Sequence, residues 1–198
     1  MTANSRRTAA TMFTAMVLGA ASCEPAVHNI TVTSPGKIAA RDDKVTVVVI
    51  QPSTHLRSIG LLDGRGQLVG QLHDRSHTVI HVPEGPTVLY AVLENRPETA
   101  DRIEGTLVPG RVYYATVSER PGGVALLTLN PRSPNDRWKH KDEYLRATPR
   151  VQMAPEKVTR LANEIGDPDP IIRAAEAYVA GLDAAARVEH EIAETDGN

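Results

Sequence analysis

The chain has 198 residues, with 22 basic and 24 acidic side chains and a single cysteine. A net charge of −2 without a basic stripe argues against a nucleic-acid-binding protein, and one Phe and one Trp offer few rings for stacking on bases. Since one cysteine cannot form an internal disulfide, packing must stabilise the fold, and the length suits one domain of roughly 100 residues with additional segments.

The segment that ends at Cys23 has the pattern of a bacterial lipoprotein signal peptide. Arg6 and Arg7 form a basic start, residues 8–18 form a short apolar region, and small residues directly precede the cysteine. The apolar region is too short to span a bilayer, which takes about 20 apolar residues. We therefore expect residues 1–22 to be a signal peptide that is removed, and Cys23 to carry lipid such as palmitate.

The expected lipid on Cys23 makes a membrane of the bacterial cell envelope the first partner of this chain. Glu24, rather than Asp, follows the cysteine. By resemblance to enterobacterial sorting signals, this residue implies the outer membrane. Ordinary secretion with an incidental cysteine, and a cytosolic chain with an apolar start, are the two alternatives.

Residues 23–43 are expected to form a polar tether, in which 28–33 alternates like a first strand. Residues 44–130 are expected to form the folded body, because short β-rich runs recur there with turn signals between them. The expected strands are 45–51, 58–62, 68–72, 78–82, 88–93, 102–107, 112–118 and 124–129.

The turn signals support a mainly β fold, which we expect to be an antiparallel β-sandwich of about seven to eight strands with a C-terminal helical extension. Asp63-Gly64-Arg65-Gly66 is the best hairpin signal, because glycine supplies the positive φ of a tight turn. Pro83-Glu84-Gly85-Pro86 marks another turn. Residues 45–50 are almost all β-branched, as in a strand covered on both faces.

Beyond the sandwich, residues 131–154 are expected to form a polar connector, with Trp138 and Tyr144-Leu145 anchoring it. Residues 155–198 are expected to form helices with a frayed acidic end. One helix ends at Gly166, and the pair Asp169-Pro170 opens another. An apolar stripe either packs against the domain or forms a groove-binding helix. Its members are Ile171, Ile172, Ala175, Tyr178, Val179 and Leu182.

Several short motifs occur in a characteristic order along the β region. They are Val47-Val48-Val49-Ile50-Gln51-Pro52-Ser53, Leu62-Asp63-Gly64, Leu68-Val69-Gly70-Gln71-Leu72, Val82-Pro83-Glu84-Gly85 and Gly110-Arg111-Val112-Tyr113-Tyr114. In this order they resemble a family of small bacterial lipoprotein β-sandwich domains of unknown function. They are also similar in pattern to the surface β-domains named for a Pro-Glu-Gly-Ala motif. The resemblance implies a lipid-anchored sandwich and no catalytic residues.

The residues that could carry chemistry do not form a known catalytic pattern. His77 and His81 share one strand face about 13 Å apart, too far to bind one metal ion together. No serine stands in a Gly-x-Ser-x-Gly turn. We therefore expect no cofactor, no metal site and no enzymatic activity; an envelope hydrolase or metal enzyme is a third, less favoured hypothesis.

The sequence favours a non-enzymatic cell-envelope lipoprotein that acts as a membrane-tethered interaction module. The partner would be an envelope protein; the alternative is a carbohydrate- or peptidoglycan-binding module. Trp138, Tyr113 and Tyr114 are the candidate contact residues for either ligand, because aromatic rings stack on sugars and anchor protein interfaces. Since Tyr113 and Tyr114 are adjacent in a strand, they point to opposite faces, and one of them is expected to lie in the core.

Overall fold

The computed structural model describes residues 30–33, 38–54, 58–93, 96–133 and 135–198. The expected signal peptide and Cys23 lie outside the described residues. The alternating segment in the expected tether contributes a short strand, Ile30–Thr33, at the edge of a sheet.

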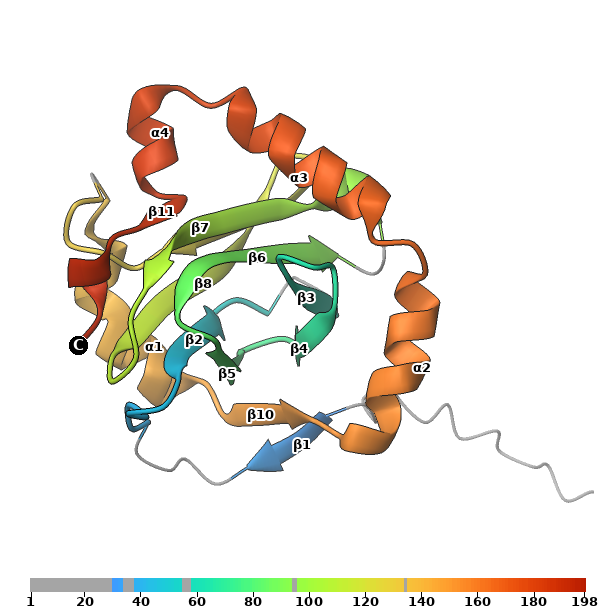
Figure 1. Cartoon of the computed structure of the whole chain (residues 1–198), viewed down its shortest axis with the longest axis horizontal. Helices are drawn as coiled ribbons and strands as arrows, with labels where there is room; N and C mark the ends of the chain where they lie inside the picture. The colour runs from blue at the N-terminus through green and yellow to red at the C-terminus, as the bar shows by residue number, and fades with distance from the viewer. Residues whose placement is uncertain (1–29, 34–37, 55–57, 94–95, 134) are drawn as a thin grey trace, which may run out of the picture.

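Two β-sheets face each other and form the body of the domain (Figure 1). The six-stranded sheet has the order β1 (Ile30–Thr33), β10 (Arg150–Met153), β5 (Ser76–Val82), β2 (Val45–Gln51), β8 (Val112–Arg120) and β9 (Gly123–Thr128). The five-stranded sheet has the order β11 (Glu191–Ile192), β7 (Asp101–Leu107), β6 (Gly85–Leu93), β3 (Ile59–Asp63) and β4 (Leu68–Leu72).

The mainly β prediction is confirmed, but the clean antiparallel sandwich is wrong. All eight strands expected in residues 44–130 are present, within about three residues of the expected bounds. Both sheets are nevertheless mixed, because β2–β8, β5–β10 and β7–β11 pair in parallel. The first of these pairs arises because β8 reaches β2 only after the chain has built most of the other sheet. The other two arise because later segments add strands at or near sheet edges.

Strand β2 is covered on both faces, as its β-branched sequence predicts. Val45, Val47 and Val49 belong to the core between the two sheets. Val48 and Ile50 belong to a second apolar cluster on the outer side of the six-stranded sheet. All five side chains are 0% exposed. Because neighbouring residues of a strand point to opposite faces, this one strand holds two apolar layers together.

Helical segments cover the outer faces of both sheets, so the domain has four layers. In chain order the described helical segments are η1 (Pro97–Thr99), η2 (Asp136–His140), α1 (Lys141–Ala147), α2 (Pro155–Ile165), α3 (Asp169–Ala180), α4 (Ala184–Val188) and η3 (Glu194–Asp196). The segments η2 and α1 pack on the six-stranded sheet, and α3 packs on the five-stranded sheet (Figure 1).

The apolar stripe of α3 faces the domain. Ile171 and Ala175 are buried in a cluster with Leu62, Tyr90 and Val92 of the sheet beneath. This stripe is therefore occupied and does not present a groove-binding helix.

The turn between α2 and α3 places the helix ends close to their expected positions. Helix α2 ends at Gly166, which has a φ of 67°, a conformation that glycine adopts without strain. Helix α3 already includes Asp169, so Asp169 is not the N-cap that the sequence predicts. The carboxylate of Asp167 instead accepts the Asp169 N–H at 3.0 Å.

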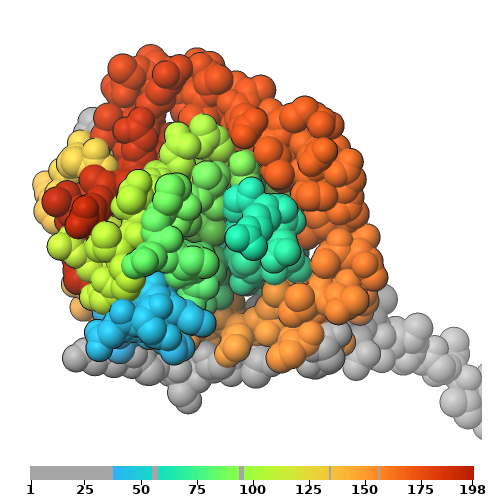
Figure 2. All heavy atoms as spheres, viewed as in Figure 1, coloured from blue at the N-terminus to red at the C-terminus, as the bar shows by residue number. Residues whose placement is uncertain are grey.

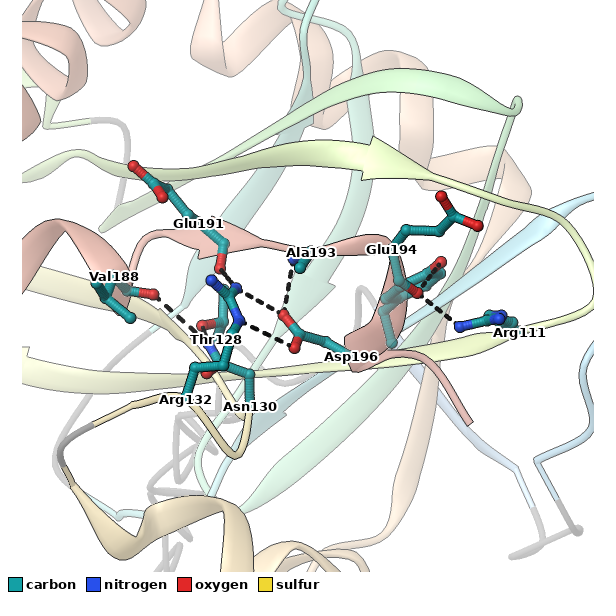
Figure 3. A network of polar contacts seen from close by, with 10 residues as sticks. Arg111, Thr128, Asn130, Arg132, Val188, Glu191, Ala193, Glu194 and Asp196 are labelled. Atoms are coloured by element: carbon teal, nitrogen blue, oxygen red, sulfur yellow. Dashed lines mark hydrogen bonds and ion pairs between the residues drawn. The ribbon is translucent and has the colours of Figure 1, made fainter.

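Residues 189–198, which we call the C-terminal strap, are bound along their length, so the expected frayed end is wrong. Strand β11 adds a parallel edge to β7, and Asn198 exchanges two backbone hydrogen bonds with Val112. Figure 3 shows the polar contacts of the strap. The guanidinium of Arg132 binds the Asp196 carboxylate at 2.9 Å and donates to the Glu191 carbonyl at 3.0 Å. These partners are remote in sequence, which explains why composition alone predicts fraying.

Gly105 provides the space that the strap needs. A Cβ added there would overlap the carbonyl oxygen of Ile192 in β11. We expect Gly105→Ala to lower the free energy of unfolding by about 1–3 kcal/mol, because the strap must shift away from β7. Urea denaturation measures this change. Gly64→Ala is the matched control, because its nearest neighbour, Val88 Cβ, would lie 3.6 Å away. If the free energy of unfolding fell by the same amount in both variants, the close fit of the strap against Gly105 would be contradicted.

Candidate functional site

Lipidation of Cys23 stays a prediction, because this residue lies outside the described residues. Among the described helices, none combines the length and apolar character needed to cross a bilayer.

The two adjacent tyrosines separate as their alternation predicts. Tyr113 is 0% exposed in the core between the sheets. Its hydroxyl accepts the Val108 N–H and donates to the Glu194 carbonyl, both at 3.2 Å. The Tyr113 ring therefore supports the C-terminal strap, and it is too deeply buried to stack on a ligand. Tyr114 points to the outer side of the six-stranded sheet.

The structure brings Tyr114, Trp138 and Tyr144 together on one surface, which we call the aromatic face. All three rings are half-buried and pack on the same outer cluster of the six-stranded sheet. They come from β8, η2 and α1, respectively. The expected anchoring of the connector by Trp138 and Tyr144 is thereby confirmed. Sequence analysis did not place Tyr144 beside Tyr114, because nothing local links positions 30 residues apart.

Two lysines lie close to the aromatic face. Lys141 Nζ is 4.5 Å from the centroid of the Tyr114 ring, within the range of a cation–π contact. Lys139 Nζ is 5.9 Å from the Trp138 ring and 2.7 Å from the Asp136 carboxylate. Burial, followed by the charge of Asp142, raises the pKa of Tyr114, so its hydroxyl stays protonated at neutral pH.

Capping interactions fix the segments that carry the aromatic face. The Asn135 side chain accepts the Arg137 N–H at 3.0 Å at the start of η2. At the end of α1, the Thr148 hydroxyl donates to the Tyr144 carbonyl at 2.8 Å and lies 2.9 Å from Nδ1 of the buried His77. The aromatic face is thus held on the sheet by polar contacts as well as by packing.

A second concave surface lies between two turns that the sequence predicts, and we call it the turn cleft. The turn between β3 and β4 and the turn between β5 and β6 border a cavity of about 620 Å³. This volume is in the range of small-molecule sites. Asp63 is committed to its own turn, because its carboxylate accepts the N–H groups of Arg65 and Gln67 at 2.9 Å each. The remaining charges in the lining, Arg65 and Glu84, have opposite signs.

Three histidines stand four residues apart in and before β5, namely His73, His77 and His81, and they do not form a metal site together. His77 is buried against Thr148, whereas His81 is exposed and lies 3.3 Å from the Thr46 hydroxyl. Burial lowers the pKa of His73, His77 and His81. Within the residues that the structure describes, no three His, Cys, Asp or Glu side chains gather in a way that could hold a metal ion.

Sequence analysis missed a buried ion pair between Asp101 of β7 and His190 of the strap. His190 Nε2 lies 3.1 Å from the Asp101 carboxylate, and the two side chains are 5% and 0% exposed. The same carboxylate accepts the N–H groups of Arg102 and Leu126 at 2.7 and 2.9 Å. The two residues are 89 positions apart, so no local signal could have identified them.

Both ring nitrogens of His190 face acceptors, because Nδ1 lies 3.0 Å from the Ala186 carbonyl. Burial disfavours the imidazolium, but the hydrogen bond to Asp101 and the charge of Asp101 outweigh it and raise the pKa of His190. His190 also lines a cavity of about 280 Å³ with Arg102, Glu104 and Arg187. With both nitrogens donating, His190 has no free lone pair for proton abstraction in that cavity.

Comparison with known proteins gives no further assignment: no protein-family model, curated protein or solved structure matches this chain.

The ion pair predicts a pH-dependent contribution to stability. Because the folded pKa of His190 is raised, this contribution is fully present below the unfolded value of 6.5 and is lost as pH rises through the folded value. We expect His190→Gln to lower the free energy of unfolding by about 3 kcal/mol at pH 6. The difference from wild type should shrink as the pH rises through the raised folded pKa of His190.

Urea denaturation at a series of pH values measures this difference. The comparison with wild type is essential, because His73, His77 and His81 have lowered pKa values and destabilise the fold toward acid pH in both proteins. A difference that grows with pH would show that His190 is neutral in the folded protein.

Proposed function

We propose that this chain is a non-enzymatic lipoprotein of the bacterial cell envelope that acts as a membrane-tethered interaction module. The observation that supports this proposal most directly is the aromatic face. Three half-buried rings from three separate segments lie on one layer of the domain, beside two lysines. Aromatic side chains with apolar rings and polar tips are typical of protein interfaces.

The position of β1 supports the proposed tether. Strand β1 is an edge strand and begins at Ile30, seven residues after Cys23. Seven residues span at most about 25 Å, so a lipid on Cys23 would hold the domain close to the bilayer. By the resemblance of Glu24 to enterobacterial sorting signals, we propose the outer membrane as the location. Two or three acyl chains on Cys23 would anchor the protein firmly.

The alternative ligand is a carbohydrate, in particular cell-wall glycan. One observation favours it: Trp138 is only half-buried, with Lys139 beside its ring and the protonated hydroxyl of Tyr114 on the same face. Ring stacking combined with nearby hydrogen-bond donors would suit a sugar. The aromatic face is therefore the proposed binding surface for either partner, an envelope protein or a cell-wall glycan.

The tether predicts that Cys23→Ser moves the protein from the membrane fraction to the soluble fraction. The intact mass of the purified wild-type protein should exceed that of the processed polypeptide by the mass of its acyl groups. Fractionation of cells by ultracentrifugation, followed by mass spectrometry, checks both expectations. A wild-type protein without added lipid would refute the anchoring role of Cys23.

The aromatic face predicts that Trp138→Ala and Lys139→Glu weaken partner binding by about tenfold, as expected for loss of an interface anchor. Cross-linking in native membranes measures the capture of envelope proteins, and co-sedimentation with purified peptidoglycan measures glycan binding. Arg173→Glu is the matched charge-reversal control, because its side chain is 69% exposed on α3 of the opposite layer.

Three outcomes separate the possibilities. Loss of one captured protein in both aromatic-face variants, but not in the control, supports the interaction module. Loss of peptidoglycan sedimentation supports the glycan alternative. If both aromatic-face variants captured envelope proteins and sedimented with peptidoglycan as wild type does, the aromatic face would be only a structural layer.

A further inference from the structure

A groove runs along one flank of α2 and is separate from the aromatic face. Its cavity of about 380 Å³ lies between α2 and the hairpin of β3 and β4. Figure 2 shows the side of the molecule on which α2, in orange, borders this hairpin, in teal. The apolar side chains that line the groove, which we call the α2 groove, are Leu68, Val158, Ala162 and Ile165.

The apolar side chains of the α2 groove are incompletely covered by the domain. Leu161 of α2 is buried, at 8% exposure, and it is not part of the groove lining. Val158, Ile165 and Leu68 are half-buried, and Ala162 is exposed. Helix α2 therefore has more apolar surface than its contact with the domain uses, and an apolar ligand could cover the remainder.

The position of β1 brings the N-terminal end of the described chain close to the start of α2, one helical turn before the first groove residue. Ile30, the first residue of β1, pairs with Met153 of β10, and α2 begins two residues later at Pro155 (Figure 1). Val158 lies within one helical turn of that start. Cys23 stands seven positions before Ile30, and a chain of that length can span up to about 25 Å, which is enough to bring a lipid on Cys23 to the start of α2.

We propose that the α2 groove holds one acyl chain of the lipid carried by Cys23. The inference rests on the proposed lipidation of Cys23 and adds a site for the lipid on the domain itself. An acyl chain exposed to water is unfavourable, and burial against Leu68, Val158 and Ile165 removes its apolar surface from water. The groove would shelter one chain whenever the protein is outside a bilayer and would release it when the chain enters the membrane.

Intramolecular photo-cross-linking tests this site in the full-length, naturally lipidated protein after detergent removal. A benzophenone side chain replaces Val158 in the groove, and the same side chain replaces the neighbouring exposed Thr159 as control. Proteolysis and mass spectrometry then identify the products. We expect the Val158 variant to give a product that joins the lipid-bearing peptide of Cys23 to the α2 peptide, and the Thr159 variant to give little of it.

A second variant tests the chemistry of the groove. We expect Ala162→Glu, added to the Val158 variant, to reduce the lipid cross-link about tenfold, because an unpaired carboxylate disfavours a neighbouring acyl chain. Because Ala162 is exposed, this substitution should leave the unfolding midpoint of the domain unchanged.

The outcomes separate this inference from the proposed function. If intact mass shows lipid on Cys23 and the Val158 and Thr159 variants cross-link to the lipid equally or not at all, the groove is not its site, while the lipoprotein assignment stands. If intact mass shows no lipid on Cys23, both the tether and the groove proposal are wrong. A lipid cross-link specific to Val158 and lost with Ala162→Glu supports the proposal.

Discussion

The buried pair of Asp101 and His190 is the contact on which the closure of this fold depends. Asp101 lies in β7 of one sheet, accepts a backbone N–H from Leu126 in β9 of the other sheet, and binds His190 of the C-terminal strap. One fully buried carboxylate thus joins three segments that are distant in the sequence. Removal of either partner would leave the other buried without its counter-charge, which is costly in a protein interior.

The strap continues this closure along the edge of the domain. Glu189 accepts the Thr128 N–H through its backbone carbonyl at 2.7 Å and a hydrogen bond from the Ser133 hydroxyl through its carboxylate at 3.0 Å. The Tyr113 hydroxyl donates to the Glu194 carbonyl, and Arg132 binds Glu191 and Asp196, as Figure 3 shows for Arg132. The strap also pairs with Glu104 and Gly105 in the middle of β7, which shortens the edge that this strand offers to other chains.

Local patterns in the sequence identify most strands, whereas hydrogen-bonded pairing between strands that are distant in the sequence decides how they assemble into sheets. The β-branched run of β2 and the alternation of Tyr113 and Tyr114 predict covered faces correctly, because each depends on neighbouring residues only. The parallel position of β8 beside β2 depends on how the chain crosses between sheets, which no local pattern specifies. The strands β10 and β11 have four and two residues, and they exist because a partner strand is available.

The residues of the candidate surfaces can likewise be identified from local patterns, whereas their arrangement depends on contacts between distant segments. Trp138 and Tyr144 are identifiable as anchors because large apolar side chains stand out in a polar connector. Their meeting with Tyr114 depends on the tertiary fold, as does the position of α2 beside β1. The ion pair of Asp101 and His190 has no sequence signature, since isolated Asp and His residues are common at protein surfaces.

The strap also has a consequence for the order in which the protein can fold during synthesis. His190 and β11 follow the other strands in the sequence, and His190 supplies the counter-charge of the buried Asp101 carboxylate. Asp101 therefore stays without this partner until residues 189–198 have been synthesised. Docking of the strap is thus the step that removes the cost of an unpaired carboxylate in the interior of the domain.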